Sequence, residues 1–248
     1  MLTYGLIGIP LTHSFSAAYF ADKFKREAIS DVQYKLFPMG NLSEFPDFIS
    51  SNPGIRGLNV TIPYKQKIVR YLDEVDESVR MIGAVNCIKI TKFRELIGYN
   101  TDVFGFEESL KGFLGRKKTK ALVLGNGGAS RAVQYVLKNR GIEFTVVSRN
   151  PFASNQRNLI GYDALDAATM KAHQLIIQTT PLGMHPDVLS SPAIPYELIG
   201  SKHLLFDLVY NPEETAFLKL GKEAGAKTMN GTEMLHLQAE RSWSIWQE

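Results

Sequence analysis

The sequence has a single cysteine, Cys87, among its 248 residues. One cysteine excludes both an intramolecular disulfide and a cysteine-based structural zinc site. The histidines show no metal-binding spacing, so no metal is predicted; they stand at positions 13, 173, 185, 203 and 236. This cysteine usage fits a reducing, cytoplasmic setting, and we interpret Cys87 as a small packed side chain.

Long apolar runs are missing as well. Residues 1–10 are apolar, but Gly5, Gly8 and Pro10 interrupt them and the stretch has no basic residues, so we predict a strand and not a signal peptide. No segment predicts a transmembrane helix, and we therefore expect no membrane partner. Short-period repeats and low-complexity segments are absent too.

The sequence has little excess of positive charge: 28 basic and 25 acidic residues give a net charge of +3. This dispersed surplus does not indicate nucleic acid as a partner, although it allows a cationic site for a small anion. Hydrophobic residues make up 44% and charged residues 21%, as in ordinary globular chains, and the length predicts one or two domains.

Short apolar runs alternate with amphipathic stretches, which is the pattern of α/β units around largely parallel sheets. In the first half, the predicted strands are residues 4–9, 32–37 and 55–61, and the predicted helices are residues 16–28, 42–50 and 64–72. A β-rich stretch, 84–99, follows with a polar turn at 91–95. The second half predicts strands at residues 121–124, 144–148, 174–178, 204–209 and 226–229, with helices at 103–113, 130–139 and 232–246.

A glycine-rich turn follows the strand 121–124 and reads Gly125-Asn126-Gly127-Gly128-Ala129-Ser130. Gly125 permits a tight turn, Gly127 lets the backbone approach a pyrophosphate, and the helix start supplies unpaired N–H donors. Ser130 replaces the third glycine of G-x-G-x-x-G, so the match is to a variant. The strand before the turn and a second strand about 20 residues later favour a dinucleotide site over an ordinary βα turn.

The end of that second strand reads Ser148-Arg149-Asn150 and has no carboxylate to bind a ribose 2′-hydroxyl. The guanidinium of Arg149 can pair with a 2′-phosphate and stack on adenine, which favours NADP over NAD. Taken alone, Arg149 could equally be a surface arginine at a strand end.

Polar side chains also gather where the strand 55–61 is expected to turn into a helix. There Lys65 follows Asn59 and Thr61, with Pro63 at the predicted helix start. An ammonium group at this point can neutralise an oxyanion and transfer a proton, although most such lysines are solvated. Asp102 could orient the lysine, or it could be the N-cap of the helix 103–113.

Tyr19 and Lys23 form a Y-x-x-x-K pair like that of short-chain dehydrogenases. In those enzymes the pair follows the nucleotide turn, whereas here it comes far before it. We assign the pair to helix packing and to the surface.

Further motifs surround these residues in an order that extends over nearly the whole chain. They are His13-Ser14-Phe15-Ser16, the segment 59–65, Gly83-Ala84-Val85-Asn86-Cys87, Asn100-Thr101-Asp102 with Gly105-Phe106, the turn 125–129, Ser148-Arg149-Asn150, the segments 179–184 and 207–212, and Gly231 with Met234-Leu235 and Gln238-Ala239. In this order and spacing the chain resembles the shikimate dehydrogenase family.

The resemblance implies an α/β fold with two domains. Residues 1–101, joined by a returning helix at 232–248, would form the substrate domain, and residues 102–231 the Rossmann domain that binds NADP. The implied activity is the NADPH-dependent reduction of 3-dehydroshikimate to shikimate in aromatic amino acid biosynthesis. The implied partners are these small molecules, bound by a monomer or homodimer.

The resemblance also implies roles for single residues. Lys65 and Asp102 would be the catalytic pair, and the remaining substrate contacts would come from Ser14, Ser16, Asn59, Thr61, Asn86, Tyr210 and Gln238. The cofactor would contact Gly125, Asn126, Gly127, Gly128, Ala129, Ser148, Arg149, Thr180, Leu208 and Gly231. A second arginine soon after Arg149 is missing, and Arg157 is the next candidate, which lowers the expected preference for NADP.

Two alternatives to this function stay open. One is a quinate/shikimate dehydrogenase with broader cofactor use, because the same polar site could accept a further ring hydroxyl. The other is a non-catalytic NADP-binding sensor, although a sensor has no need of a proton donor such as Lys65.

Overall fold

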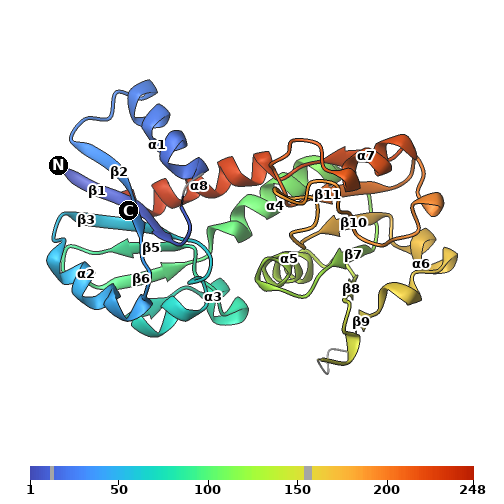
Figure 1. Cartoon of the computed structure of the whole chain (residues 1–248), viewed down its shortest axis with the longest axis horizontal. Coiled ribbons are helices and arrows are strands. Elements are labelled where there is room, and N and C mark those ends of the chain that lie inside the picture. Colours follow the sequence, from blue (N-terminus) through green and yellow to red (C-terminus); the bar gives the residue numbers. More distant parts are fainter. Residues whose placement is uncertain (12–13, 154–157) are drawn as a thin grey trace. The chain divides into compact units, whose positions relative to one another are not determined.

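The structure is a computed structural model that describes residues 1–11, 14–153 and 158–248 (Figure 1). His13 and Arg157, both named from the sequence, lie outside the described residues. The chain divides into two compact units. The first unit is Met1–Thr101 with Ala239–Glu248, and the second unit is Asp102–Gln238.

The first unit is built on a six-stranded sheet of order β2-β1-β3-β5-β6-β4. Its elements are β1 (Leu2–Gly8), α1 (Phe15–Arg26), β2 (Val32–Pro38), η1 (Leu42–Glu44), α2 (Phe45–Ser51), β3 (Ile55–Val60), η2 (Lys67–Tyr71), β4 (Glu74–Val75), α3 (Glu77–Ile82), β5 (Cys87–Ile90) and β6 (Leu96–Tyr99). The strands predicted in this half are present, with ends shifted by one or two residues.

The sheet of the first unit is mixed: three of its five described strand pairs are parallel, and the two pairs made by β5 are antiparallel. β1 pairs in parallel with β2 and β3, whereas β5 is antiparallel to both β3 and β6. The cause is the predicted turn at 91–95, in which the Thr91 N–H donates to the Glu95 carbonyl at 3.0 Å. So short a connection can join only antiparallel strands.

The predicted helix 64–72 is wrong over its first turn. The Lys65 carbonyl accepts a hydrogen bond from the Val85 N–H at 2.7 Å. In an α-helix the same carbonyl would instead accept the N–H of the residue four positions later in the chain. Lys65 therefore lies in a turn, and only η2 is helical, as a 3₁₀ segment.

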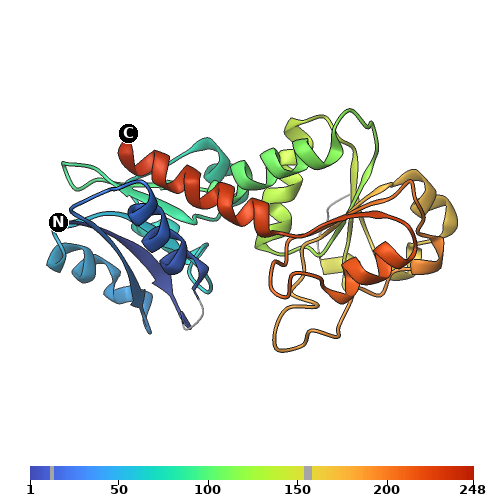
Figure 2. The ribbon, with the colours of Figure 1, turned by 90° about the horizontal axis from the view of Figure 1, so that it is seen from above.

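Both faces of this sheet are covered by apolar side chains. On one face Phe45, Leu58 and Ile68 belong to a single buried cluster. On the other, Tyr4 and Phe20 pack with Trp246, whose indole N–H donates to the Ile88 carbonyl at 3.0 Å. Trp246 lies on α8 (Thr232–Gln247), and Figure 2 shows the C-terminal turns of this helix beside α1. Residues 239–248 thus complete the core of the first unit.

The second unit contains a six-stranded sheet of order β12-β11-β10-β7-β8-β9, and every pair in it is parallel. Its elements are α4 (Thr101–Leu114), β7 (Ala121–Leu124), α5 (Gly128–Asn139), β8 (Phe144–Val147), η3 (Pro151–Ala153), β9 (Leu159–Ile160), η4 (Tyr162–Ala164), α6 (Ala167–Ala172), β10 (Leu175–Gln178), η5 (Tyr196–Leu198), β11 (Leu204–Asp207), α7 (Ala216–Glu223) and β12 (Lys227–Met229). The first residue of α4, Thr101, still belongs to the first unit.

Counted from β7, the strand order of the second unit is 6-5-4-1-2-3, which is the Rossmann arrangement. Phe106 of α4 and Val133 of α5 pack on one face, and Met170 of α6 and Phe217 of α7 on the other. The predicted α/β fold with a Rossmann domain is confirmed. Ligands of such sheets bind where the strand order reverses, which here is between the carboxyl ends of β7 and β10.

No helix in the described part of the chain is both long enough and apolar enough to cross a bilayer.

Candidate functional site

The two predicted serines lie at the start of α1. Ser14 is the residue before the helix, and its buried hydroxyl has no hydrogen-bond partner among residues 1–11, 14–153 and 158–248. A buried hydroxyl left unpaired costs about 1–3 kcal/mol, so Ser14 is suited to bind a ligand oxygen. Burial raises the pKa of the Tyr34 phenol, and a hydrogen bond with Ser16 opposes that rise, which places Ser16 beside Tyr34.

A buried polar network occupies the end of β3 in the first unit. The Tyr34 phenol donates to Asn59 Oδ1 at 2.8 Å, and Asn59 Nδ2 donates to Ser242 Oγ at 3.0 Å and to the Asn86 carbonyl at 3.2 Å. Ser242 Oγ is also 3.1 Å from Thr101 Oγ1. Both N–H bonds of Asn59 are thus made to protein groups, so its amide joins β3 to the C-terminal turns of α8.

Asn86 has its carbonyl side fixed by the same network. Its Oδ1 accepts the Thr101 N–H at 2.7 Å and the Thr101 hydroxyl at 3.2 Å. This directs Nδ2 of Asn86 away from Thr101, as a donor for another group. Beside it, Asn100 donates to the Ala84 carbonyl at 2.9 Å, while its own buried Oδ1 is unpaired within the described part of the chain.

Lys65 lies half-buried in the turn between β3 and η2. The backbone around Lys65 is fixed by two hydrogen bonds. The phenol of the buried Tyr64 donates to the Met39 carbonyl at 2.5 Å, and the Lys65 carbonyl accepts the Val85 N–H. Thr61, half-buried, donates its backbone N–H to the Ile7 carbonyl at 2.9 Å. The turn therefore presents the lysine side chain from an anchored backbone.

Asp102 is the second residue of α4 and the first residue of the second unit. Because α4 begins at Thr101, the interpretation of Asp102 as its N-cap is wrong. A carboxylate within the first turn is stabilised by the positive end of the helix dipole.

The phosphate turn of the second unit has the geometry that its glycines predict. Gly125 has φ +108, and a Cβ there would lie 2.8 Å from Thr180 Cγ2 and 2.9 Å from Thr179 Oγ1. Only glycine fits this position. Gly127 is the N-cap of α5, and residues 126–129 are exposed, so the N-terminal N–H groups of a 12-residue helix stand at the point where the strand order reverses. Ser130 is fully buried and accepts from Gln134 at 2.9 Å.

A cavity of about 710 Å³ opens beside this turn, a volume in the range of ligand sites. It brings together predicted residues from the ends of β8 and β10 with others from η4. Its lining includes Ser148, Arg149, Tyr162, Asp163 and Thr180. Tyr162 and Asp163 were missed by sequence reasoning, because the two-residue strand β9 that presents them is too short to give a pattern.

The residues that follow β11 are held by a buried carboxylate. Asp207 is fully buried; its Oδ2 accepts from the Thr215 hydroxyl at 2.6 Å and its Oδ1 from the Val209 N–H at 2.9 Å. Burial raises the pKa of Asp207 to about 7, although both bonds oppose the rise. The Leu208 N–H donates to the Gln178 carbonyl at 3.0 Å, and the Gly231 N–H donates to the Val209 carbonyl at 3.1 Å.

Leu208 and Gly231 are thus brought together beside the end of β10. Tyr210 of the same loop is 40% exposed. Gln238, the last residue of the second unit, is 9% exposed, and its amide nitrogen donates to the Leu235 carbonyl at 2.9 Å.

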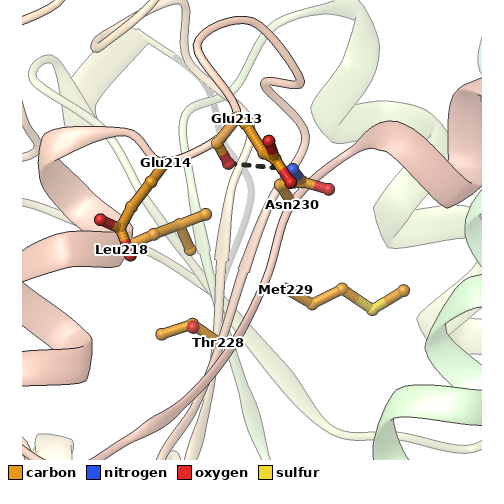
Figure 3. Close-up of a pocket in the computed structure, with 6 residues that line it drawn as sticks. All are labelled: Glu213, Glu214, Leu218, Thr228, Met229 and Asn230. Carbon is orange, nitrogen blue, oxygen red and sulfur yellow. Dashed lines mark hydrogen bonds between the residues drawn. The ribbon is translucent and has the colours of Figure 1, made fainter.

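A second cavity in this unit, of about 450 Å³, contains none of the predicted residues (Figure 3). Its lining includes the carboxylates of Glu213 and Glu214, with Asn230 donating to the Glu213 carbonyl at 2.9 Å, and no basic side chain among its described residues. Glu214 pairs with Lys222 at 3.2 Å, but the described lining itself offers a phosphate no cation, so this cavity does not suit a dinucleotide.

Tyr19 and Lys23 pack against the C-terminal turns of α8, as expected for a helix-packing role. Lys23 Nζ is 2.8 Å from both Glu27 Oε1 and Glu240 Oε2, and the Tyr19 phenol donates to Glu240. Burial disfavours the charge of Lys23, but these bonds outweigh it and raise the lysine pKa. Its side chain is only 5% exposed, so the assignment to the surface is wrong for Lys23.

Cys87 is fully buried, and burial raises the pKa of its thiol to about 12. Such a thiol is a poor nucleophile, as its interpretation as a packed side chain requires. Across the described ranges, no three His, Cys, Asp or Glu side chains are close enough to hold a metal ion.

Comparisons with known proteins agree with this geometry. Residues 6–88 match the family model of the shikimate dehydrogenase substrate binding domain. The chain is 37% identical to the shikimate dehydrogenase (NADP(+)) of Methanococcus vannielii, over 98% of this chain and 90% of the relative. It is 39% identical to the same enzyme of Clostridium beijerinckii, over 99% and 92%.

A solved structure extends the likeness to three dimensions. The shikimate 5-dehydrogenase of Thermus thermophilus, determined in complex with NADP(H) and shikimate, has a TM-score of 0.85 to this chain at 32% identity. The match covers 99% of this chain and 93% of that one.

Proposed function

Because this chain belongs to the shikimate dehydrogenase family, we propose that it catalyses the reversible NADPH-dependent reduction of 3-dehydroshikimate to shikimate in aromatic amino acid biosynthesis. One observation carries the proposal: a complete Rossmann sheet places Arg149 and Thr180 on one cavity, with Thr180 against Gly125 of the phosphate turn, in a chain whose relatives, matched over nearly their full length, are named shikimate dehydrogenase (NADP(+)). Residues 1–101 with the returning helix 232–248 are the proposed substrate domain, and residues 102–231 the proposed NADP domain, although residues 232–238 of that helix pack with the second unit.

The substrate is an anionic, hydroxylated ring, and the polar side chains of the first unit suit it. The hydroxyls of Ser14 and Ser16 donate hydrogen bonds to the substrate carboxylate, and the Ser14 hydroxyl, buried and without a partner among the described residues, supports this role. Asn86, with Nδ2 directed away from Thr101, donates to a ring hydroxyl, and Thr61, Tyr210 and Gln238 are the further contacts we propose. For Asn59, whose two N–H bonds are made within the protein, we propose a supporting role.

Bound NADPH would supply the hydride for the ketone carbon of the substrate. Lys65 then stabilises the charge that develops on the ketone oxygen and donates a proton to it. Asp102 accepts a hydrogen bond from the neighbouring substrate hydroxyl and orients the lysine. The anchored turn around Lys65 supports this role, since a positioned ammonium loses little freedom on reaction.

The second unit supplies the groups that would hold NADP. The exposed N–H groups at the start of α5, in the turn 125–129, bind the pyrophosphate. Arg149 pairs with the 2′-phosphate, and Ser148 and Thr180 line the same cavity. Leu208 and Gly231, brought together beside β10, contact the remainder of the cofactor.

We also propose a cytoplasmic location and a monomer or homodimer. The buried, free thiol of Cys87 suits a reducing compartment. Every proposed contact comes from one chain, so a monomer is sufficient.

The test is an assay of the purified protein with shikimate or quinate and with NADP or NAD, followed by the absorbance of the reduced nicotinamide. We expect turnover to be fastest with shikimate and NADP. Absence of turnover with every pair would leave a non-catalytic NADP-binding protein. Faster turnover of quinate with NAD would overturn the proposed substrate and cofactor.

A further inference from the structure

The cavity beside the phosphate turn contains a carboxylate as well as a cation. β9 pairs in parallel with β8, with Val147 opposite Ile160, and the Ser148 N–H donates to the Ile160 carbonyl at 2.9 Å (Figure 1). Arg149 and Tyr162 therefore leave neighbouring strands at the same edge of the sheet. Burial raises the pKa of the Tyr162 phenol, and the charge of Arg149, which lines the same cavity, opposes this rise.

Asp163 follows directly, and its side chain folds back toward the strand end. A Cβ at position 161 would clash with Asp163 Oδ1 and lie 3.7 Å from Pro151 Cγ. The carboxylate thus lies where a side chain at position 161 would begin, so glycine at that position leaves room for it. Asp163 and Arg149 line the same cavity, and Asp163 is exposed to solvent there.

These two charges act in opposite senses on the adenosine ribose of a bound cofactor. A 2′-phosphate carries a charge of about −1.5 to −2; Arg149 attracts it and Asp163 repels it. A free 2′-hydroxyl, by contrast, can donate a hydrogen bond to a carboxylate, which is how sites for unphosphorylated dinucleotides bind it. The carboxylate comes here from η4, after β9, and not from the end of β8.

We propose that Asp163 is a specificity-determining residue that lowers the preference of this site for a 2′-phosphorylated ribose and lets it bind the unphosphorylated ribose as well. The inference rests on the proposed function, since it assigns the cavity to the adenosine end of the dinucleotide. Arg149 favours the phosphorylated ribose, and Asp163 offsets part of that preference.

The experiment measures binding of two cofactor fragments that cannot react, adenosine 2′,5′-bisphosphate and adenosine 5′-diphosphate, by calorimetry on the full-length protein. The quantity compared is the ratio of the two dissociation constants, 5′-diphosphate over 2′,5′-bisphosphate. We expect Asp163→Asn to raise this ratio at least threefold and Arg149→Gln to lower it at least threefold.

Asp187→Asn is the matched control, because Asp187 is another exposed aspartate of the second unit and does not line the cavity. It should leave the ratio within a factor of two. Circular dichroism checks that each variant folds, and Asp163→Ser replaces Asp163→Asn if the latter does not.

A ratio that changes less than threefold in the folded Asp163 variant would overturn the proposal. If that happens while the wild-type protein oxidises shikimate with NADP, only the role of Asp163 is lost. If the wild-type protein binds neither fragment and turns over no substrate, the proposed function fails with it.

Discussion

Asp207 shows how one buried residue can make stability depend on pH. Its carboxyl is fully buried at the end of β11, and burial raises its pKa to about 7, whereas an unfolded chain gives an aspartate a pKa near 3.9. The folded state therefore binds the proton more tightly than the unfolded state. The stabilising contribution of this proton is complete below about pH 4 and is lost as the pH rises through 7.

We expect the free energy of unfolding to fall between pH 4 and 7 through this group, by on the order of 2–4 kcal/mol. Urea unfolding across this range measures it. In Asp207→Asn the side chain cannot titrate, so the part of the slope due to Asp207 should disappear. An unchanged slope in that variant would show that Asp207 titrates normally in the folded protein.

Lys65 carries the prediction for the chemical step. Lys65→Ala should lower turnover of shikimate by at least about 100-fold, the low end for a positioned acid, because no ammonium then stabilises and protonates the ketone oxygen. Lys67→Ala, which removes an exposed lysine at the start of η2, should keep near wild-type turnover. Binding of adenosine 2′,5′-bisphosphate should persist in both, and activity near wild type in Lys65→Ala would contradict the proposed role.

For single residues, the sequence predicts which chemical groups a site contains better than it predicts which partners those groups contact. It named Lys65 and Arg149 as candidates, because ammonium and guanidinium groups suit anionic ligands, and Ser14 became a candidate through the family resemblance. It could not show that both N–H bonds of Asn59 are made within the first unit, since one partner, Ser242, is 183 residues away. Asp163 was missed because its approach depends on the space left by Gly161.

The turn from β7 to α5 requires glycine at its first position. In Gly125→Ala the new methyl group would meet Thr179 and Thr180, in a backbone conformation with φ +108 that alanine rarely adopts. We expect a loss of about 1–3 kcal/mol in the free energy of unfolding and weaker binding of adenosine 2′,5′-bisphosphate.

Gly112→Ala is the matched control for this change. Gly112 lies in α4, a Cβ there meets nothing within 4 Å, and alanine favours a helix by up to about 1 kcal/mol. Its stability should be equal or higher, with unchanged fragment binding. Equal effects of the two substitutions would show that the turn does not require glycine.

Elements that coincide with a continuous apolar run could be predicted from the sequence. Elements whose limits depend on hydrogen bonds to distant residues could not. The strands β7, β8 and β10 end within a residue of their predicted positions, because each is a buried apolar run. The start of the helix predicted at 64–72 failed because Val85 competes for the Lys65 carbonyl. β9 has two residues and therefore no periodicity to detect.

The whole molecule depends on packing between distant parts of the chain, most clearly at Trp246. Its ring stacks on Tyr4 with centroids 5.0 Å apart. Trp246→Ala should lower the stability of the first unit by about 3–5 kcal/mol, because it empties a large buried site. Phe93→Ala, which removes a ring that is 74% exposed in the same unit, should change stability little.

Urea unfolding followed by fluorescence can assign this loss to the first unit. Trp243 and Trp246 are the only tryptophans in the sequence, and both belong to that unit. In the Trp246→Ala variant, the fluorescence of Trp243 still reports the unfolding of the first unit. A midpoint equal to that of Phe93→Ala would mean that residues 239–248 are not needed for this core.

The discontinuity of the first unit bears on the order of events during synthesis. The second unit is one unbroken segment, Asp102–Gln238, whereas the first needs Ala239–Glu248 to fill its core. The ribosome makes those ten residues only after the whole second unit. The second unit can therefore complete its core while the first, although begun earlier, still exposes the apolar surface around Tyr4 and Phe20 to chaperones and proteases.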